Sequence, residues 1–331
     1  MVVAVLAVLA AGTQPGHAES TPRRRLTRAT PVPTPPARPV IYATFVSHND
    51  ESRSNAPCRA MLQDGRYSAN RAAIVAMAET IVSHNAAWDF QSDWEYLLTV
   101  SGSDTDEERT TTGGKNIVEW LAERDPGRIA VDAHSHEASG YNYADVAQLL
   151  ADLGVPTTGI VGGFLWTPIE AQNWTRFQSA PLTGLRPPFP RWSPIALWGG
   201  GSRNHTDDAQ ASGVWRPRDA ASFFIDDPAQ VLFNIGNWKG GVADASGLVD
   251  LLDRLHSGQL ESGRLYTAHV FLTQCTLDLP GDSSEPAAVA ALIDRFAPDV
   301  ASGDLVWATL PTIAAVWQTI YRREPTMLRD E

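Results

Sequence analysis

From Val40 to the C-terminal end, segments with a strand-like pattern of apolar residues alternate with segments in which apolar residues have helical spacing. Short runs rich in β-branched and aromatic residues predict buried strands, and apolar residues at helical spacing predict helices. Strands are expected at residues 41–47, within 88–100, and at 128–134, 157–166, 195–198, 229–235, 265–273 and 305–310. Helices are expected at residues 68–83, 116–124, 143–153, 248–256, 286–296 and 311–321.

Strands that are separated by helices indicate the α/β class, with a parallel sheet and helices on its faces. The number of such units in residues 40–331 favours a (β/α) barrel with parallel strands and outer helices over an open doubly wound sheet. No glycine-rich nucleotide-binding turn follows the first strand. A barrel of this kind places its active site at the carboxyl ends of the strands, and this rule selects the polar residues that matter.

The N-terminal segment has the pattern of an export signal. Residues 2–11 are an apolar run, and small residues near Ala18 suit cleavage before Glu19, so residues 1–18 are expected to be an export signal that is either cleaved or kept as an anchor. The run is too short to span a bilayer, and no integral membrane domain is expected. Residues 19–39, rich in proline and arginine, predict a linker. The protein is therefore expected in the periplasm, at the cell surface or outside the cell, with one folded domain at residues 40–331.

Charge and cysteine content narrow the classes of partner. The net charge of −12 argues against a nucleic-acid partner, because phosphate recognition needs a basic surface. Cys58 and Cys275 each follow the predicted end of a strand. Either a disulfide bond between them or two unrelated buried thiols fits this placement. The eleven tryptophans suit packing in the core, and some could instead stack on sugar rings.

The strand at residues 128–134 ends in the most informative polar motif. Period-two alternation places Asp132, His134 and His136 on one face. Three ionisable groups on one face need partners, since burying each of them alone is costly. Two imidazoles at a strand exit can converge on a divalent metal ion. A pair of solvated loop histidines is the alternative interpretation.

The first strand ends in a second candidate motif. His48 and Asp50 share a face there, and an imidazole with a carboxylate would complete a mixed nitrogen and oxygen site of the kind that Zn²⁺ prefers. Alternatively, Asp50 only stabilises the following turn. His269 lies inside an apolar strand, where it is either a core residue or a general acid near the site.

With these motifs placed, the chain resembles the polysaccharide deacetylases, or NodB-like carbohydrate esterases, of the glycoside hydrolase/deacetylase barrel superfamily. Val46-Ser47 stand where that family has two aspartates. The motifs that carry the resemblance are Thr44-Phe45 with His48-Asn49-Asp50, His134-Ser135-His136, Arg186-Pro187-Pro188-Phe189 or Trp215-Arg216-Pro217, and Tyr266-Thr267-Ala268-His269.

The resemblance implies a distorted (β/α) barrel and a metal-dependent deacetylase of acetylated polysaccharide or oligosaccharide. A divalent metal, Zn²⁺, would polarise the acetyl carbonyl and activate a water molecule. Asp50 would accept a proton from that water, and His269 would protonate the departing amine. The implied metal ligands are His48, Asp50, His134 and His136, and the implied substrate-binding residues are Arg186, Arg216, Trp166, Trp215 and Trp238.

Two other functions remain open at this point. The string from Asp132 to His136 also resembles the Asp-x-His-x-His signature of amidohydrolase-type and PHP-type metal hydrolases. In those enzymes the motif ends the first barrel strand, whereas here a long folded segment precedes it. The altered acidic motif at Val46-Ser47 also suits a non-catalytic barrel that only binds glycan.

Overall fold

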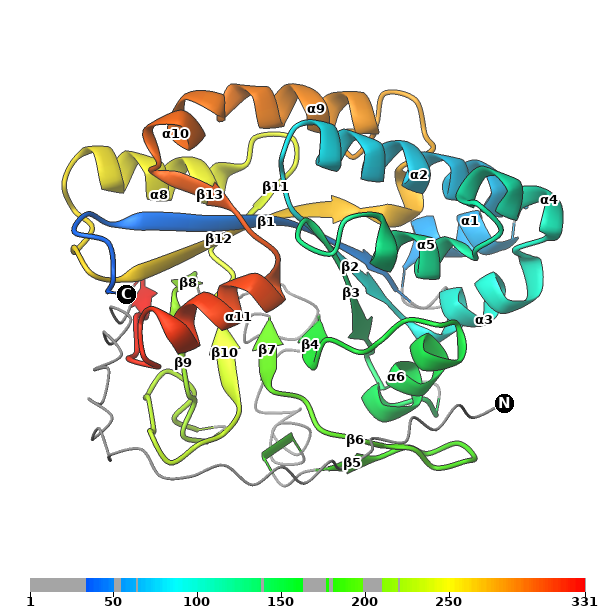
Figure 1. Cartoon of the computed structure of the whole chain (residues 1–331), viewed down its shortest axis with the longest axis horizontal. Coiled ribbons are helices and arrows are strands. Elements are labelled where there is room, and N and C mark those ends of the chain that lie inside the picture. Colours follow the sequence, from blue (N-terminus) through cyan, green and yellow to red (C-terminus); the bar gives the residue numbers. More distant parts are fainter. Residues whose placement is uncertain are drawn as a thin grey trace, which may run out of the picture. The chain divides into compact units, whose positions relative to one another are not determined.

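A curled sheet of ten strands lies at the centre of the computed structural model (Figure 1). β13 (Leu305–Trp307) pairs with the first half of β1 (Val40–Asn49), and among the described strands of this sheet only β10 (Phe233–Ile235) and β9 (Val214–Trp215) pair antiparallel. The structure describes residues 34–50, 55–63, 65–137, 140–162, 177–178, 181–198, 210–219 and 221–330. The main path of the sheet is, in order, β11 (Lys239–Gly241), β12 (Leu265–Thr273), β1 (Val40–Asn49), β2 (Trp88–Ser92), β3 (Ile129–His134), β4 (Ile160–Gly162), β7 (Ala196–Trp198), β10 (Phe233–Ile235) and β9 (Val214–Trp215).

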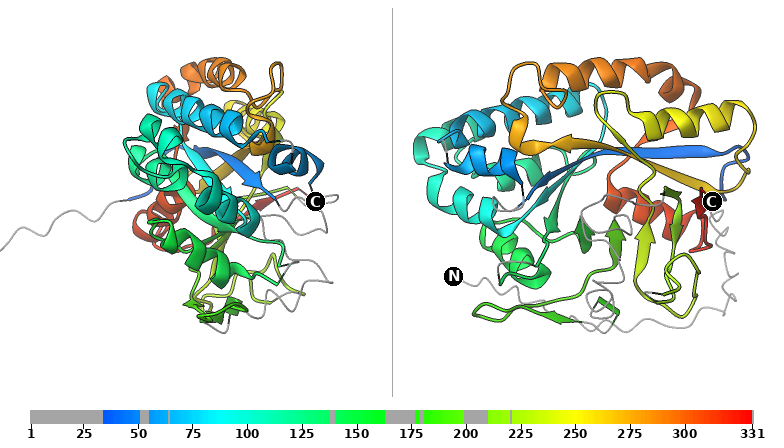
Figure 2. Two further views of the ribbon diagram at one scale, coloured as in Figure 1. Left: turned by 90° about the vertical axis from the view of Figure 1, so that its right-hand side faces the viewer. Right: turned by 180° about the vertical axis from the view of Figure 1, so that it is seen from behind.

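Helices cover the outer face of this sheet. Figures 1 and 2 show α2 (Tyr67–Ser83), α8 (Ser246–His256), α9 (Pro286–Arg295) and α10 (Ala297–Ser302) on one side of β1 and β12, with α11 (Leu310–Thr319) on the other side. Two small ribbons, β5 (Leu182–Thr183) with β6 (Arg191–Trp192) and β8 (Ala211–Ser212) with β14 (Leu328–Arg329), lie apart from the main sheet. The α-helices in the described part of the chain are α1 (Ala56–Gln63), α2 (Tyr67–Ser83), α3 (Trp94–Ser103), α4 (Asp106–Arg109), α5 (Ile117–Arg124), α6 (Tyr143–Asp152), α8 (Ser246–His256), α9 (Pro286–Arg295), α10 (Ala297–Ser302) and α11 (Leu310–Thr319).

The curl of the sheet is completed by side-chain hydrogen bonds in place of a last strand pair. The Thr267 hydroxyl of β12 accepts from the Gly213 N–H at 2.8 Å and donates to the Gly236 carbonyl at 2.9 Å. The Ser212 hydroxyl in turn accepts from the Thr267 N–H at 2.7 Å. These bonds join β12 to the segments around β9 and β10, so the sheet forms a distorted (β/α) barrel, as expected.

Alternation along β1 divides the core into two parts. Ile41 and Phe45 belong to the cluster under the outer helices, whereas Val46 packs in the inner cluster with Trp198 and Trp317. Because strand side chains point to opposite faces in turn, His48 lies on the same inner side as Val46. The candidate site is therefore built on the inside of the barrel.

The elements expected from the sequence are largely confirmed, with differences at their ends. The strand expected within residues 88–100 stops at Ser92, since the Asp93 carboxylate accepts from the Trp94 N–H and begins α3. Of the strand expected at residues 157–166, the described part is β4, Ile160–Gly162. The proposed export signal and residues 19–33 of the linker lie outside the described residues.

Cys58 of α1 and Cys275, which follows β12, form a disulfide bond. The alternative of two unrelated thiols is therefore wrong. The two cysteines are 217 residues apart in the sequence, and the bond joins the segment after β1 to the segment after β12. Since the carboxyl ends of those strands carry the candidate site, the cross-link constrains its surroundings.

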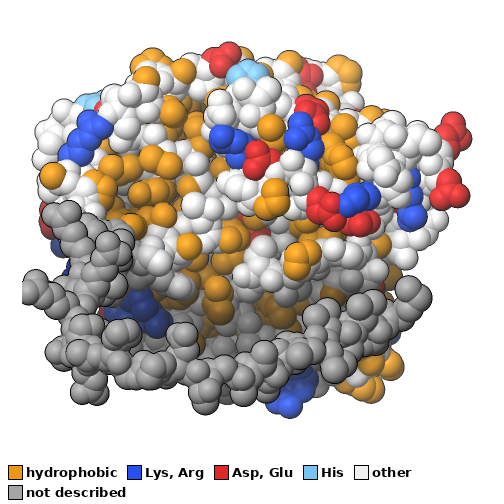
Figure 3. Space-filling view, viewed as in Figure 1, with side chains coloured by type: hydrophobic (Ala, Val, Ile, Leu, Met, Phe, Trp, Pro, Cys, Tyr) orange, Lys and Arg blue, Asp and Glu red, His pale blue; other side chains and the backbone are white. Residues whose placement is uncertain are grey.

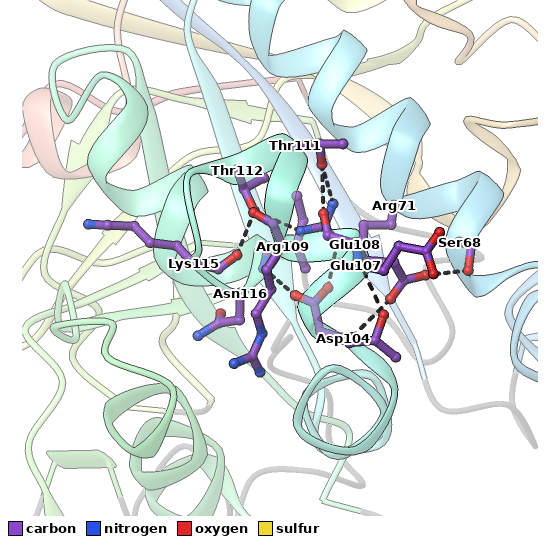
Figure 4. Close-up of polar contacts among 12 residues, drawn as sticks. Ser68, Arg71, Asp104, Glu107, Glu108, Arg109, Thr111, Thr112, Lys115 and Asn116 are labelled. Atoms are coloured by element: carbon purple, nitrogen blue, oxygen red, sulfur yellow. Dashed lines mark hydrogen bonds and ion pairs between the residues drawn. The ribbon is translucent and has the colours of Figure 1, made fainter.

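A buried ion pair joins α2 to the segment before α5 (Figure 4). Arg71 and Asp104 are 3% and 5% exposed, and the Arg71 Nε lies 2.5 Å from an Asp104 carboxylate oxygen. The other guanidinium nitrogens donate to the Thr111 and Thr112 hydroxyls, each at 2.8 Å. The second carboxylate oxygen accepts from the Ile117 N–H at 2.7 Å. Both charged groups thus have their ion-pair and hydrogen-bond partners inside the protein.

The surface carries simpler ion pairs. Acidic and basic side chains lie side by side over part of the face in Figure 3, and the pairs Arg124–Glu79 and Lys115–Glu123 are of this exposed kind. None of the helices in the described part of the chain combines the length and apolar character that a membrane span requires.

Candidate metal centre

The curl of the sheet brings the ends of β1 and β3 together. His48 on β1 and His134 on β3 face each other across β2, with ring centroids 4.2 Å apart. Asp50 follows β1, and its Oδ1 lies 2.9 Å from the His134 Nε2. One possible ligand atom from each of these three residues lies within 4.8 Å of the other two. Two imidazole nitrogens and one carboxylate oxygen at this spacing fit a divalent metal such as Zn²⁺, with a fourth position left for water.

His136 stands at the edge of this set rather than inside it. Its Nε2 is 3.7 Å from the Asp50 Oδ1, and its side chain is 36% exposed, whereas the His134 side chain is fully buried. β3 ends at His134, and Glu137 adopts a positive φ of 53°. The chain turns at this point, so the strand alternation that placed the two histidines on one face stops before His136.

The charges around Asp50 favour its ionised form. Burial by itself would raise the pKa of Asp50. The hydrogen bond with His134 and the positive charges of His134, His48 and His136 outweigh burial and hold the pKa of Asp50 well below its usual value. A carboxylate that stays ionised is the form that ligates a metal.

His269 lies outside the three-residue set and is buried beside it. The Trp198 indole N–H donates to the His269 Nδ1, so the imidazole proton resides on Nε2. Burial lowers the pKa of His269 to about 3, and the ring is therefore neutral at neutral pH. The His269 Nε2 has no hydrogen-bond partner among the described residues. The sequence expectation of a protonated general acid needs a charged ring, which this environment disfavours.

A pocket of about 400 Å³ opens beside His269. Two of its walls, Trp198 and Phe271, meet the His48 ring edge-on, at centroid distances of 5.4 and 4.9 Å. The pocket is thus adjacent to the candidate metal set. Its principal lining side chains are Trp198, Gln210, Asn237, Lys239, His269 and Phe271.

Two acidic side chains lie buried on β2 and β3. Asp89 accepts from the Thr44 hydroxyl at 2.7 Å and from the Leu310 N–H at 3.1 Å. Asp132 accepts from the Thr158 hydroxyl at 2.5 Å. Burial raises the pKa of Asp132 to about 6, and burial with the Asp132 charge raises the pKa of Asp89. Asp132 thus supports the strand that carries His134 instead of reaching the site itself.

The tryptophans expected to stack on sugar belong to the core. Trp215 and Trp238, which were expected to bind substrate, are each 1% exposed in this structure. Their indole N–H groups donate inside the protein, to the Phe223 carbonyl at 2.7 Å and to Asp250 at 3.0 Å. Burial of large aromatic side chains with a paired N–H is their ordinary structural role. Trp166 lies outside the described residues.

The two arginines expected to bind substrate have different environments. Arg216, which was expected to contact substrate, is 7% exposed and pairs with Asp226 at 2.8 Å. Arg186 is exposed, and its backbone is positioned by Asp145, whose carboxylate accepts from the Leu185 and Arg186 N–H groups at 2.9 Å. Only Arg186 of this pair is presented to solvent.

Arg186 completes a stacked column beside the His136 loop. Trp94 and Tyr141 stack at a centroid distance of 4.6 Å, and the Arg186 guanidinium carbon lies 4.6 Å from the Tyr141 ring centroid. Arg186 also donates to the Gly140 carbonyl at 2.9 Å. Trp94 follows β2 and Tyr141 follows β3 in the chain, so the column lies at the carboxyl ends of the strands. Its part in substrate binding stays a prediction.

Several residues of the site were not found by sequence reasoning. Phe271 is two positions after His269 on β12, and strand alternation could have identified it. Trp198 ends a strand that the pattern did predict. Lys239 lies on β11, which has three residues. A strand of three residues is too short to show an alternating pattern of apolar and polar residues. Nothing in the sequence therefore places Lys239 near the site.

Comparison with known proteins supports the fold. No protein-family model and no curated protein sequence matches the chain. The solved structure of a candidate polysaccharide deacetylase from Mycobacterium smegmatis has a TM-score of 0.50 at 12% identity, over 92% of this chain and 99% of its own. The allantoinase Puue has a TM-score of 0.48 at 12% identity, over 90% of this chain and 98% of its own. The similarity to the candidate deacetylase structure agrees with the expected deacetylase-like barrel in fold.

Proposed function

We propose that this protein is a metal-dependent hydrolase that removes acetyl groups from a polysaccharide by cleaving an amide C–N bond or an ester. The observation that carries the proposal is the set of His48, Asp50 and His134, whose ligand atoms lie within 4.8 Å of one another. The set is located where a barrel enzyme holds its active site, at the carboxyl ends of β1 and β3. The likeness of the fold to that of the candidate deacetylase supports the same class.

His48, His134 and Asp50 would hold Zn²⁺ or a similar ion. When bound, such an ion supplies a Lewis acid that polarises the acyl carbonyl and lowers the pKa of a bound water. Asp50 keeps its negative charge in this environment and fixes the orientation of the His134 ring through the 2.9 Å contact. A carboxylate that is held so strongly in its ionised form is a weak base, so its main part is to hold and orient.

Two other histidines complete the proposal. His269 stays neutral and offers its Nε2–H as a hydrogen-bond donor to the substrate, in place of the proton transfer that the family resemblance implies. His136 lies 3.7 Å from Asp50 and is partly exposed, so it can exchange protons with water. Imidazole is the side chain suited to such exchange near neutral pH. We therefore assign proton transfer to His136.

Acetate release tests the proposed reaction. We expect the zinc-loaded protein to release acetate from fully acetylated chitooligosaccharide or from an O-acetylated glycan, because the site can polarise an acyl carbonyl. Acetate is quantified by an enzymatic assay, with the same protein after dialysis against a chelator as the control. Release that is unchanged by the chelator contradicts metal dependence.

The same assay separates the two alternative functions. Tight glycan binding with bound metal and no acetate release favours a non-catalytic barrel. Hydrolysis of a cyclic amide without release from any glycan favours an amidohydrolase-type enzyme. Against the latter, the set of possible ligands among the described residues is limited to His48, Asp50 and His134, and does not include the further histidine that such enzymes need.

We also propose that the protein is exported. The apolar run at residues 2–11 carries this proposal, and the Cys58–Cys275 disulfide bond supports it, because such bonds persist in oxidising compartments. We expect protein recovered from the extracellular or periplasmic fraction of the native cell to begin at Glu19 and to show no free thiol after denaturation. Intact-mass analysis with alkylation measures both. Cytosolic protein that retains residues 1–18 and two free thiols would contradict the proposal.

A further inference from the structure

Both oxygens of the Asp50 carboxylate are held by other side chains. Its Oδ1 lies 2.9 Å from the His134 Nε2, and its Oδ2 accepts from the Asn55 Nδ2 at 2.8 Å. An aspartate on the surface can rotate about its last bond, which exchanges the two oxygens. Here such a rotation would break both contacts, so the protein itself fixes the orientation of this carboxylate. Asn55 is partly buried and belongs to none of the motifs that the sequence singled out.

Asn55 is in turn fixed by the helix that follows it. It precedes the first residue of α1, and its Oδ1 accepts from the Cys58 N–H at 3.2 Å, as an asparagine at a helix N-terminal cap does. The cap uses the oxygen of the side-chain amide, while the nitrogen of the same amide donates to Asp50. Of the common capping residues only asparagine has an amide nitrogen to donate in this way.

The disulfide bond joins this cap to the rest of the barrel. The N–H group from which Asn55 accepts belongs to Cys58, and Cys58 is bonded to Cys275 after β12. A shift of α1 would carry Asn55 away from the Asp50 carboxylate, and a hydrogen bond weakens steeply when it is misaligned. The disulfide bond therefore limits the motion of the residue that orients Asp50.

The backbone of Asp50 is anchored separately from its side chain. Asn49 lies between His48 and Asp50, and its Nδ2 donates to the Gln274 Oε1 at 2.8 Å. Its Oδ1 accepts from the Asp93 N–H, also at 2.8 Å. These bonds join the end of β1 to the residue after β2 and to the segment after β12. The backbone of Asp50 is thus held without Asn55, whose own contribution is the orientation of the carboxylate.

We propose that Asn55 is a positioning residue that orients Asp50 for metal binding, and that the Cys58–Cys275 disulfide bond keeps it in place. Asn55 holds Oδ2 and so keeps Oδ1 directed at His134. Groups that hydrogen-bond to a metal ligand raise the affinity for the metal, because they hold the ligand in the orientation that binding requires. The orientation of Asp50 stands on the contacts alone, whereas its use in metal binding rests on the proposed function.

Asn55→Ser separates the two roles of this residue. Serine also caps helices, but it has no amide nitrogen that could reach Asp50. We expect the zinc affinity of this variant to fall by about 10- to 100-fold in competition with a chromophoric chelator. The matched control is Asn116→Ser, because Asn116 caps α5 and its amide nitrogen donates to the Leu153 carbonyl at 2.9 Å. Its zinc affinity should equal that of the parent. Equal affinity of Asn55→Ser and the parent overturns the metal-binding role.

The contact itself is tested on the metal-free protein. Long-range ¹H–¹⁵N spectra resolve the ring nitrogens of histidine, and the Nε2 signal of His134 is expected to shift in Asn55→Ser, since the Asp50 Oδ1 is no longer held against it. Asn116→Ser should leave that signal in place. Unchanged His134 signals in Asn55→Ser overturn the proposal, whatever the zinc affinity of the variant.

Removal of the disulfide bond tests the second half of the proposal. Cys58→Ser combined with Cys275→Ser is expected to lower the zinc affinity, because α1 then moves relative to Asp50. In the Asn55→Ser background the same pair should cause little further loss, since changes that act through one contact are not additive. Additive losses overturn this half. If the cysteine variant does not fold, the folded parent is reduced with a phosphine, alkylated at both thiols and assayed in the same competition.

Failure of this proposal and failure of the proposed function are distinguishable. A parent protein that binds no zinc, with a His134 signal that shifts in Asn55→Ser, contradicts the metal centre and leaves the orientation of Asp50 by Asn55 standing. Tight zinc binding that is the same in the parent and in Asn55→Ser has the opposite meaning. A lower zinc affinity together with a shifted His134 signal supports both.

Discussion

His134→Ala is expected to lower zinc affinity and acetate release by at least about 100-fold. Loss of residues that merely orient a metal ligand already costs about 10- to 100-fold, and His134 would be a ligand itself. The substitution also removes the 2.9 Å contact between His134 and Asp50, which leaves that carboxylate without this hydrogen-bond partner. Zinc content by elemental analysis and acetate release measure the two effects.

The control for this prediction is His256→Ala. His256 lies in α8, is half exposed and is remote in the fold from the ends of β1 and β3, so zinc content should be unchanged. Zinc content in His134→Ala that equals the parent value contradicts the proposed metal centre. Unfolding curves for both variants exclude general misfolding as the reason for a loss.

The structure also predicts an order among the histidines. His136→Ala should reduce zinc affinity less than His134→Ala, because His136 stands outside the three-residue set and is partly exposed. If His136 carries the proton transfer, acetate release should fall in this variant while most of the zinc is retained. A loss of zinc as large as that of His134→Ala would place His136 among the ligands.

Asp104→Ala is expected to reduce the free energy of unfolding by about 3–5 kcal/mol. Its removal leaves the Arg71 guanidinium buried without a counter-charge, and uncompensated buried charges are strongly destabilising. The Ile117 N–H at the start of α5 loses its acceptor at the same time. Urea unfolding followed by circular dichroism measures the change.

Two further variants sharpen this prediction. Glu79→Ala breaks the exposed pair with Arg124 and should cost at most about 1 kcal/mol, because solvent screens such pairs. The double variant Arg71→Met with Asp104→Leu removes both buried charges and should lose less stability than Asp104→Ala alone. A cost below about 1 kcal/mol for Asp104→Ala would show that water reaches Arg71.

Stability and chemistry thus depend on different layers of the barrel. The Arg71–Asp104 pair lies among the outer elements α2 and α5, whereas the metal set lies at the inner ends of β1 and β3. We therefore expect Asp104→Ala, at temperatures where it is folded, to retain its zinc. His134→Ala should conversely bind little zinc at temperatures where it is folded.

Local pattern was enough to predict the elements that carry the site. β12 has the predicted bounds, and β1 and β3 differ from expectation only at their ends, because long runs of buried residues have a clear period. In a parallel barrel those strands carry His48 and His134 to the same end of the sheet, here on either side of β2. The class of fold and the two histidines of the metal set could therefore be predicted without coordinates.

Tertiary structure alone decided which neighbours these residues have. His136 leaves the set because the chain turns after His134, and Trp215 and Trp238 are core residues because the fold closes over them. The pocket draws on segments far apart in the chain, including the three-residue strand of Lys239. The spacing of apolar residues in the sequence indicates which face of a helix or strand a residue occupies. It does not report how far a sheet curls, and the curl determines which faces meet.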